Sequence, residues 1–345
     1  MKSLGVFCSY NIKLIGGQTT KTIELLNMAN KYFENVNVLN QKEKKSYIHL
    51  LKSFVELFRR NENIIIIVSS TGYFKLLPFV AIILHFYNRN IYEIVIGGMR
   101  YEYVKRKKWS IPIIKKFKKI YVESSYMVEK YHELGVTNAE FLANYKTFPE
   151  MSEQQLKLVF NKESFKICTF SRIDKYKGID TAIEICKYLH SEYDNPGIIL
   201  DIYGPIEEEY KAEFEKLLIL QPKYISYKGV IDNRLSINTL KDYDCFLCPT
   251  KWQNEGFPGA FIDALASGLP ILATKRENFK DIIKDGKNGF LIQENDIRQY
   301  AEHIMDWYRN RDELLEAKRN ALRESKKYQT DIVLKKMFQD MDNVI

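Results

Sequence analysis

The chain alternates short apolar segments with longer amphipathic ones along nearly its whole length, and this series occurs twice. In the first half, strand-like runs such as Ile64–Ser69 and Lys119–Glu123 are separated by helical patterns. The polar run MSEQQLKLVFNKES, which we interpret as a linker, precedes a second series of such runs that begins at Lys166–Phe170. Alternating strands and helices indicate parallel sheets with helices on both faces. We therefore predict an α/β chain built from two Rossmann-like, doubly wound domains.

Length and composition agree with two globular domains. The 345 residues are many for one hydrophobic core and suit two. We place the N-terminal domain at residues 1–155 and the C-terminal domain at residues 156–325. The content of 46% hydrophobic and 28% charged residues is that of a globular chain. No apolar run reaches the ~20 residues that a bilayer span needs, and the N-terminus lacks the layout of a signal peptide, so we expect a cytoplasmic protein.

The formal net charge is +8, which admits nucleic acid, an anionic membrane or an anionic substrate as a partner. Residues 104–119 interleave lysines and one arginine with apolar residues such as Trp109 and Ile111. This mixture fits a surface that touches anionic lipid headgroups, and it fits equally a solvated helix face. We expect no nucleic-acid partner, because the cations gather in one apolar-rich segment rather than along aromatic stacking platforms.

Five cysteines are scattered along the chain, and two of them have the spacing of a metal knuckle. These two, Cys245 and Cys248, lie in a predicted strand, where positions three apart point to opposite faces. Two ligands on opposite faces cannot share one metal ion. We therefore interpret both cysteines as core residues and expect no metal site.

The most specific motif is EGFPGAFIDALASGLPILAT, residues 255–274. Glu255 lies in a Gly-Phe-Pro turn, Pro258 is suited to open a helix, and Asp263 falls inside that helix. We expect Gly268 to end the helix in the left-handed conformation. A loop acid, a helix N-terminus and a second acid can together bind a ligand that carries a diphosphate and hydroxyl groups.

A second motif, FSRIDKYKGIDTAIE, lies upstream at residues 170–184. It places Arg172 and Lys177 after a predicted strand and before a helix. An arginine can grip phosphate oxygens as a fork and a lysine can contact them as a point charge, so the pair suits a pyrophosphate.

Together the two motifs resemble those of family-four glycosyltransferases of the GT-B fold, in which two domains face a central cleft. The resemblance implies that Arg172 and Lys177 grip the diphosphate of a nucleotide-sugar donor. Ser171 stands where the family usually has glycine. The resemblance also implies that the last helix, within residues 326–345, packs back on the N-terminal domain.

In the same family the later motif binds the sugar and the ribose. Glu255 would orient the donor sugar, and Asp263, which replaces the usual glutamate, would hold the ribose diol. The remaining donor contacts expected from this motif are Gly256, Phe257, Pro258 and Gly259. Of these, the N–H groups of Phe257 and Gly259 are expected to contact the diphosphate.

Glycines elsewhere permit a close approach of the backbone to the donor. Gly16 and Gly17 lie between the first predicted strand and the first helix, whose N-terminus favours anions. In the family, a glycine in the place of Gly204 lets the backbone approach the nucleotide, and the backbone near Val230 faces the base.

The N-terminal domain departs from the family at GGMR, residues 97–100. Many family members carry a histidine in this loop, which helps to position the sugar. The candidate acceptor-side residues are therefore Gly97, Gly98 and Arg100. Arg100 could bind an anionic acceptor, and it could equally be an exposed, solvated arginine.

The resemblance implies a glycosyltransferase that transfers a sugar with retention from a nucleotide-diphosphate sugar, without a metal or another cofactor, and we expect a UDP-sugar as the donor. A basic, apolar N-terminal domain fits a lipid-linked saccharide acceptor and a peripheral position at the inner face of the plasma membrane. A composition rich in Lys, Ile, Asn and Tyr suggests a bacterial source and hence capsule, exopolysaccharide or lipopolysaccharide assembly. Two alternatives stay open: a nucleotide-sugar epimerase of the same fold, and a non-catalytic basic scaffold protein.

Overall fold

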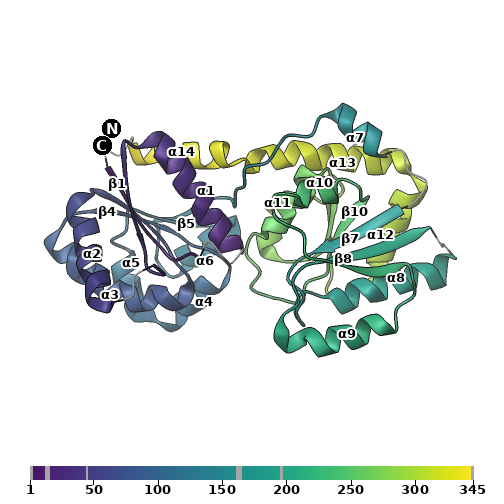
Figure 1. Ribbon diagram of the computed structural model, residues 1–345, viewed down its shortest axis with the longest axis horizontal. Coiled ribbons are helices and arrows are strands. Elements are labelled where there is room, and N and C mark those ends of the chain that lie inside the picture. The colour runs from purple at the N-terminus through teal and green to yellow at the C-terminus, as the bar shows by residue number, and fades with distance from the viewer. Residues whose placement is uncertain (1–2, 12–15, 44–45, 161–164, 195–196, 343–345) are drawn as a thin grey trace. The chain divides into compact units, whose positions relative to one another are not determined.

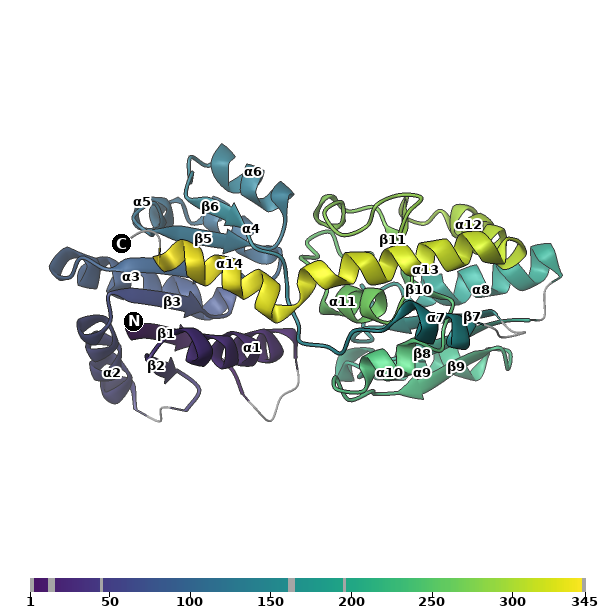
Figure 2. The same cartoon turned by 90° about the horizontal axis from the view of Figure 1, so that it is seen from above.

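A computed structural model describes residues 3–11, 16–43, 46–160, 165–194 and 197–342. The chain divides into two compact units (Figures 1 and 2). The first unit consists of Met1–Thr147, Asn254–Phe257 and Tyr328–Ile345, and the second of Phe148–Gln253 and Pro258–Lys327. Each unit contains a six-stranded parallel sheet, so the predicted α/β class with two Rossmann-like domains is confirmed.

The first unit is a parallel sheet with strand order β2-β1-β3-β4-β5-β6. Its strands are β1 (Ser3–Cys8), β2 (Asn35–Asn40), β3 (Asn63–Ile67), β4 (Asn90–Ile94), β5 (Lys119–Val122) and β6 (Ala139–Phe141). Its helices are α1 (Gly17–Tyr32), α2 (Tyr47–Arg60), α3 (Ser70–Phe86), α4 (Met99–Arg106), η1 (Lys108–Ser110), α5 (Ile111–Ile114), α6 (Ser125–Glu133) and α14 (Thr330–Asp342).

Strand β3, with the sequence NIIII, shows why this sheet is covered on both faces. Successive side chains of a strand point to opposite faces. Ile64 and Ile66 accordingly enter a core with residues of α2 to α6, while Ile65 and Ile67 enter a core with residues of α1 and α14. A strand buried on both faces reads as a continuous apolar run.

The C-terminal helix α14 belongs to the first unit and contacts α1 (Figure 1). The Phe338 ring lies 5.4 Å from the Tyr32 ring and 5.3 Å from the Phe33 ring, measured between centroids. Residues 343–345 of the predicted final helix lie outside the described residues. The contacts of α14 show how a distant part of the sequence completes the core on this face of the sheet.

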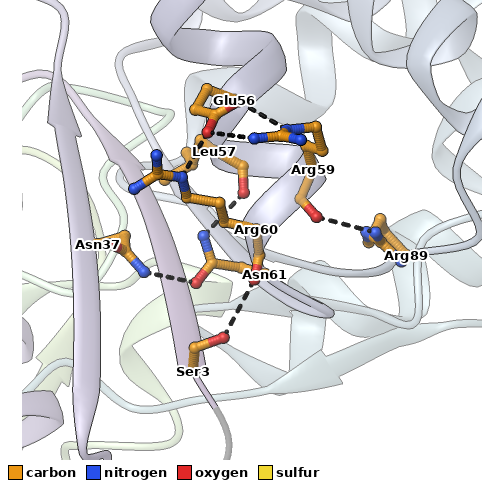
Figure 3. Close-up of polar contacts among 8 residues, drawn as sticks. All are labelled: Ser3, Asn37, Glu56, Leu57, Arg59, Arg60, Asn61 and Arg89. Carbon is orange, nitrogen blue, oxygen red and sulfur yellow. Dashed lines mark hydrogen bonds and ion pairs between the residues drawn. The ribbon is translucent and has the colours of Figure 1, made fainter.

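The C-terminal end of α2 is fixed by a polar network (Figure 3). Asn61, the C-cap residue, donates from Nδ2 to the Leu57 carbonyl at 2.8 Å and accepts from Asn37 Nδ2 at 2.8 Å. Ser3 Oγ donates to the Arg60 carbonyl at 3.3 Å, and Arg89 donates to the Arg59 carbonyl at 3.2 Å. The bonds to Arg59 and Arg60 give partners to carbonyls at the end of the helix, and the bonds from Ser3 and Asn37 tie α2 to β1 and β2.

The second unit is a parallel sheet with strand order β12-β11-β10-β7-β8-β9. Its strands are β7 (Phe165–Phe170), β8 (Ile198–Tyr203), β9 (Ile225–Gly229), β10 (Cys245–Cys248), β11 (Ile271–Thr274) and β12 (Gly289–Ile292). Its helices are α7 (Glu153–Phe160), α8 (Ile179–Tyr193), η2 (Glu208–Tyr210), α9 (Lys211–Ile219), α10 (Ser236–Leu240), α11 (Gly259–Ala266), η3 (Glu277–Phe279), α12 (Ile297–Arg309) and α13 (Arg311–Ser325), with η4 (Lys326–Tyr328) running into the first unit.

The predicted linker of residues 151–164 is in part a helix, α7. Leu156 of this helix is buried, and its side chain lies against Gly268 and beside Leu322 of α13. Phe160, at the end of the helix, packs against the core of the second unit, so two apolar side chains dock a short helix in a run that we had interpreted as a linker. Residues 161–164 lie outside the described residues.

Candidate active site

The second unit has a topological switch point between β7 and β10, because its strand order runs outward in both directions from this pair. In doubly wound folds, ligands bind outside the carboxyl ends of the strands at such a point. Arg172 and Lys177 follow β7, and Pro249 follows β10. Arg172 and Lys177, the two residues predicted to bind a diphosphate, therefore lie at the edge of the sheet where the topology favours a bound ligand.

Two glycines let the backbone segments at this edge pack closely. Gly204, after β8, has a φ of 140°, and a Cβ on it would lie 1.7 Å from the Ser171 carbonyl oxygen. Gly178, which precedes α8, has a φ of 68°, and a Cβ on it would lie 1.9 Å from the Pro249 carbonyl oxygen. A side chain would be strained at both positions, so glycine is required for the loops after β7, β8 and β10 to meet.

Arg172 and Lys177 differ in exposure and in the contacts that hold them. The exposed Arg172 guanidinium forms an ion pair with Glu207, with 2.9 Å between Nη1 and Oε1. The Asp174 carboxylate accepts hydrogen bonds from the N–H groups of Tyr176 at 2.7 Å and Lys177 at 3.1 Å. This turn leads the chain into α8 and holds the half-buried Lys177 at the start of that helix.

Helix α11 ends as its sequence predicts, because Gly268, just past the end of the helix, has a φ of 70°. It begins one residue later than predicted, since Pro258 is the extended N-cap residue and Gly259 the first residue of the helix. The Asp263 carboxylate is only 4% exposed and accepts a hydrogen bond of 3.0 Å from Ser236 Oγ on α10. Val230, in contrast, is 65% exposed in the loop after β9. Ribose binding by Asp263 stays a prediction, and Ser236 is a hydrogen-bond partner of this carboxylate.

The turn Asn254–Phe257 belongs to the first unit, although residues of the second unit flank it in the sequence. Phe257 is buried, its N–H donates to Glu123 Oε2 at 3.4 Å, and its carbonyl accepts from Asn144 Nδ2 at 3.0 Å. The Phe257 ring packs edge-on against Tyr328, with 5.0 Å between centroids. The N–H group of Phe257, which the sequence analysis directs at a phosphate, is therefore engaged by a carboxylate in this structure.

Glu123 is a buried carboxylate beside the turn of Glu255, and the sequence analysis missed it. It follows β5, is 3% exposed, and accepts hydrogen bonds from three separate segments of the first unit. Its Oε1 accepts from Lys21 Nζ of α1 at 3.0 Å, and its Oε2 accepts from the Gly97 N–H at 2.9 Å and from Phe257. A carboxylate at the carboxyl end of a parallel strand was the sequence signal that could have revealed it.

Gly97 and Gly98 pack against the turn Asn254–Phe257. Gly97 has a φ of 75°, and a Cβ on Gly98 would lie 2.4 Å from the Asn254 carbonyl oxygen. Gly16 and Gly17, at the start of α1, are exposed, and a Cβ on either would meet no atom within 4 Å. Glycine is thus favoured at position 97 by the positive φ and required at position 98 by a backbone contact, whereas the surrounding atoms do not require glycine at positions 16 and 17.

Arg100 is neither exposed nor placed to bind an acceptor, which corrects both interpretations of this residue. It is 1% exposed and forms an ion pair with Glu93. Its Nη2 donates to the Val68 carbonyl at 2.7 Å, and its guanidinium lies 3.8 Å from the centroid of the Tyr73 ring. Burial raises the pKa of Glu93, and the adjacent Arg100 opposes this rise. Arg100 is therefore a structural cation of the first unit.

Among the residues that the structure describes, no group of three or more His, Cys, Asp or Glu side chains could hold a metal ion. On β10, Cys245 is buried and Cys248 is half-buried. Burial raises the pKa of the Cys8 and Cys186 thiols to about 12, so both are protonated at neutral pH.

Within the same described residues, no helix is long and apolar enough to cross a bilayer.

Comparison with known proteins gives the family. The model of the family described as "Glycosyl transferases group 1" matches residues 150–327, just over half of the chain. The chain therefore belongs to the glycosyl transferases group 1 family, which comprises retaining and generally metal-independent glycosyltransferases.

Several curated relatives are named for bacterial polysaccharide biosynthesis. The chain is 26% identical over 190 residues to the capsular polysaccharide biosynthesis glycosyltransferase CapM of Staphylococcus aureus, a match covering 54% of this chain and 41% of CapM. It is 24% identical over 152 residues to the amylovoran biosynthesis glycosyltransferase AmsK of Erwinia amylovora, covering 41% of this chain and 36% of AmsK. The matched part thus spans less than half the length of each relative.

Solved structures confirm the fold. Anabaena Alr3699/HepE in complex with UDP superposes with a TM-score of 0.78 and 14% identity, covering 99% of this chain and 100% of that protein. The same protein in complex with UDP-glucose gives a TM-score of 0.75, with 13% identity over 98% of this chain and 99% of the other. The chain has the GT-B fold.

Proposed function

We propose that this protein transfers a sugar, with retention at the anomeric carbon, from a UDP-sugar to a saccharide acceptor in capsule or exopolysaccharide assembly. The observation that carries the proposal is the placement of Arg172 and Lys177 together at the switch point of the second unit. UDP and UDP-glucose bound to HepE, and the polysaccharide pathways of CapM and AmsK, support the choice of donor and of pathway.

Arg172 and Lys177 neutralise the charge that builds on the leaving diphosphate, the role that a metal ion has in other transferases. A diphosphate would replace Glu207 as the ion-pair partner of Arg172, because it carries more negative charge and accepts a bidentate contact. The start of α11 at Gly259 adds N–H groups that lack partners within the helix, and it takes over the contact assigned to the Phe257 N–H. The backbone at Gly204 and Val230 faces the nucleotide.

Glu255 accepts hydrogen bonds from the donor sugar and orients its ring, and Asp263 holds the ribose. Replacing Glu255 by glutamine removes the charge and keeps the size of the side chain. We expect Glu255→Gln to retain UDP binding and to lose sugar transfer, because the interaction matters most as charge develops on the sugar. Wild-type turnover in this variant would contradict the role of Glu255.

We further propose that the acceptor is lipid-linked and that the first unit docks on an anionic bilayer, at the inner face of the plasma membrane. In the segment 104–119, Ile114 and Phe117 are buried, and Trp109 is the large apolar side chain that is exposed. Further exposed apolar side chains lie on α2 and α3, at the spacing i, i+3, i+7 in each helix. They are Ile48, Leu51 and Val55 on α2, and Phe79, Ile82 and Phe86 on α3.

Both helices cover the same face of the sheet, since their inner residues share one core. Lys52 and Lys75 are exposed in the two apolar stripes. Glu56 of α2 contacts Arg59 and Arg60, whose hydrogen bonds lower the pKa of its carboxyl to about 2, so the acid is matched by two cations (Figure 3). Apolar stripes between cations suit helices that lie in the interface of an anionic membrane.

The test of the donor site is thermal stabilisation by UDP, GDP, ADP and CDP, each with and without EDTA. A ligand at a hundred times its dissociation constant adds about 2.7 kcal/mol of stability. We expect a shift with UDP that EDTA leaves unchanged. No shift with any nucleotide would favour a scaffold protein, and release of an altered free sugar from a UDP-sugar would favour an epimerase.

A further inference from the structure

The buried ion pair between Lys21 and Glu123 lies directly against the turn that carries Glu255. All the groups concerned belong to the first unit. The side chains of Lys21 and Glu123 are 3% and 4% exposed. Taking two charges out of water is costly, and a buried ion pair by itself adds little stability over apolar residues. A role other than stabilising the fold would explain why a buried ion pair lies beside the turn Asn254–Phe257.

The contacts of the Glu123 carboxylate indicate that role. One oxygen, Oε1, is bound by Lys21 at 3.0 Å, and this ion pair leaves Oε2 facing the backbone. Oε2 accepts from the N–H of Gly97 at 2.9 Å and from the N–H of Phe257 at 3.4 Å. Two loops that are far apart in the sequence thus share one charged acceptor, and charge-assisted bonds to backbone N–H groups are the stronger kind.

The residues on both sides of Glu255 in the turn contact other parts of the first unit. A Cβ on Gly256 would lie 2.5 Å from Glu123 Oε2 and 3.0 Å from the Gly97 Cα. Asn254 contacts Gly98 through its carbonyl oxygen, and the Phe257 carbonyl accepts from Asn144. Lys21 is held in its turn, because its ammonium lies 5.3 Å from the Tyr145 ring centroid and its carbonyl accepts from the Tyr145 hydroxyl. The backbone of Asn254, Gly256 and Phe257, which flank Glu255, is therefore held by these contacts.

We propose that Glu123, set by Lys21, is a positioning residue for sugar transfer: it holds the turn Asn254–Phe257 so that Glu255 meets the donor sugar. This inference rests on the proposed function. Glu123 does not touch the donor but acts through the turn. A displacement of about 1 Å at a group that orients a substrate can cost 100-fold in rate, so the positioning should appear in kcat.

The test compares Glu123→Gln with Glu93→Gln in the full-length protein. Both carboxylates are buried in the first unit and paired with a cation, but Glu93 pairs with Arg100 and has no contact with the turn. A glutamine at 123 turns an amide NH₂ toward either Lys21 or the two N–H groups. We expect its kcat for sugar transfer to fall at least tenfold, with the UDP dissociation constant within twofold of wild type. Glu93→Gln should lower the melting temperature and leave kcat unchanged. A wild-type kcat in folded Glu123→Gln would overturn the proposal.

Should Glu123→Gln fail to fold, the double variant Lys21→Met with Glu123→Leu removes both buried charges together. We expect it to regain part of the melting temperature lost in the single variants without regaining kcat, because leucine offers no acceptor to the Gly97 and Phe257 N–H groups. Recovery of both kcat and the melting temperature would show that the Lys21–Glu123 ion pair has only a structural role. Glu255→Gln is assayed in parallel: if it keeps full turnover, the proposed function fails, whereas loss of turnover there with normal kcat at Glu123→Gln defeats the positioning role alone.

Discussion

At the scale of single residues, burial decides which of the charged side chains can meet a ligand. Three cations of this chain illustrate the range: Arg172 is exposed beside one acid, Lys21 is buried against Glu123, and Arg100 is buried against Glu93. Only the first can exchange its partner for an incoming anion without leaving a buried charge unpaired. The sequence shows three basic residues, and burial assigns them three different roles.

The ion pair between Arg172 and Glu207 predicts opposite effects for its two members. Arg172→Ala should weaken UDP binding by about 1.5–3 kcal/mol, the contribution of a hydrogen bond to a charged group. Glu207→Gln should strengthen UDP binding by up to about 1 kcal/mol, because it removes an exposed pair that competes with the ligand. Isothermal titration calorimetry with UDP measures both. Weaker binding in both variants would mean that Glu207 contacts the nucleotide rather than competing with it.

At the scale of elements, helix α13 shows how the packing of a helix can bury a lysine and lower its pKa. Lys318 of this helix is 2% exposed, and its ammonium donates to the Tyr243 carbonyl at 2.5 Å. Burial lowers the pKa of Lys318 to about 8, while the nearby Asp244 acts in the opposite direction. The helix thus packs on the sheet with a lysine that gives up its proton more readily than an exposed lysine does.

This shift makes the stability of α13 packing depend on pH. Between pH 8 and 10.5 the unfolded chain keeps the Lys318 proton that the folded chain releases, so the free energy of unfolding rises with pH in this range. Relative to Lys318→Met, the wild type should therefore gain about 2–3 kcal/mol from pH 7 to pH 10. Urea unfolding of both proteins at both pH values measures the difference, in which the contributions of tyrosines cancel. A constant difference would show that Lys318 keeps its usual pKa.

At the scale of the whole molecule, the net charge of +8 and the exposed apolar stripes of α2 and α3 act together. Large contiguous apolar surface on a soluble protein marks an interaction site. The large apolar side chains that the second unit exposes include Ile219 and Leu220, neighbours at the end of α9. Because this pair lies outside the proposed docking face, it provides a matched control.

We expect the triple variant of α3, with serine at positions 79, 82 and 86, to sediment less with liposomes containing anionic phospholipids than the wild type. Serine at positions 219 and 220 should leave sedimentation unchanged. Raising the salt concentration should weaken the binding of the wild type, since it screens the attraction of the lysines to the headgroups. Equal loss of sedimentation in both variants would point to non-specific apolar adsorption, and no sedimentation of the wild type would favour a soluble acceptor.

The sequence by itself determined the α/β class, the two Rossmann-like sheets, the cap of α11 at Gly268 and the position of Arg172 and Lys177 at the end of β7. These features depend on local periods and on turn chemistry that neighbouring residues encode. The tertiary structure alone decided that the turn Asn254–Phe257 belongs to the first unit, that Glu123 and Lys21 lie under it, and that Arg100 is buried. The tertiary structure was needed because these contacts join segments more than a hundred residues apart, or follow from which face of a helix is covered, and neither leaves a regular spacing in the sequence.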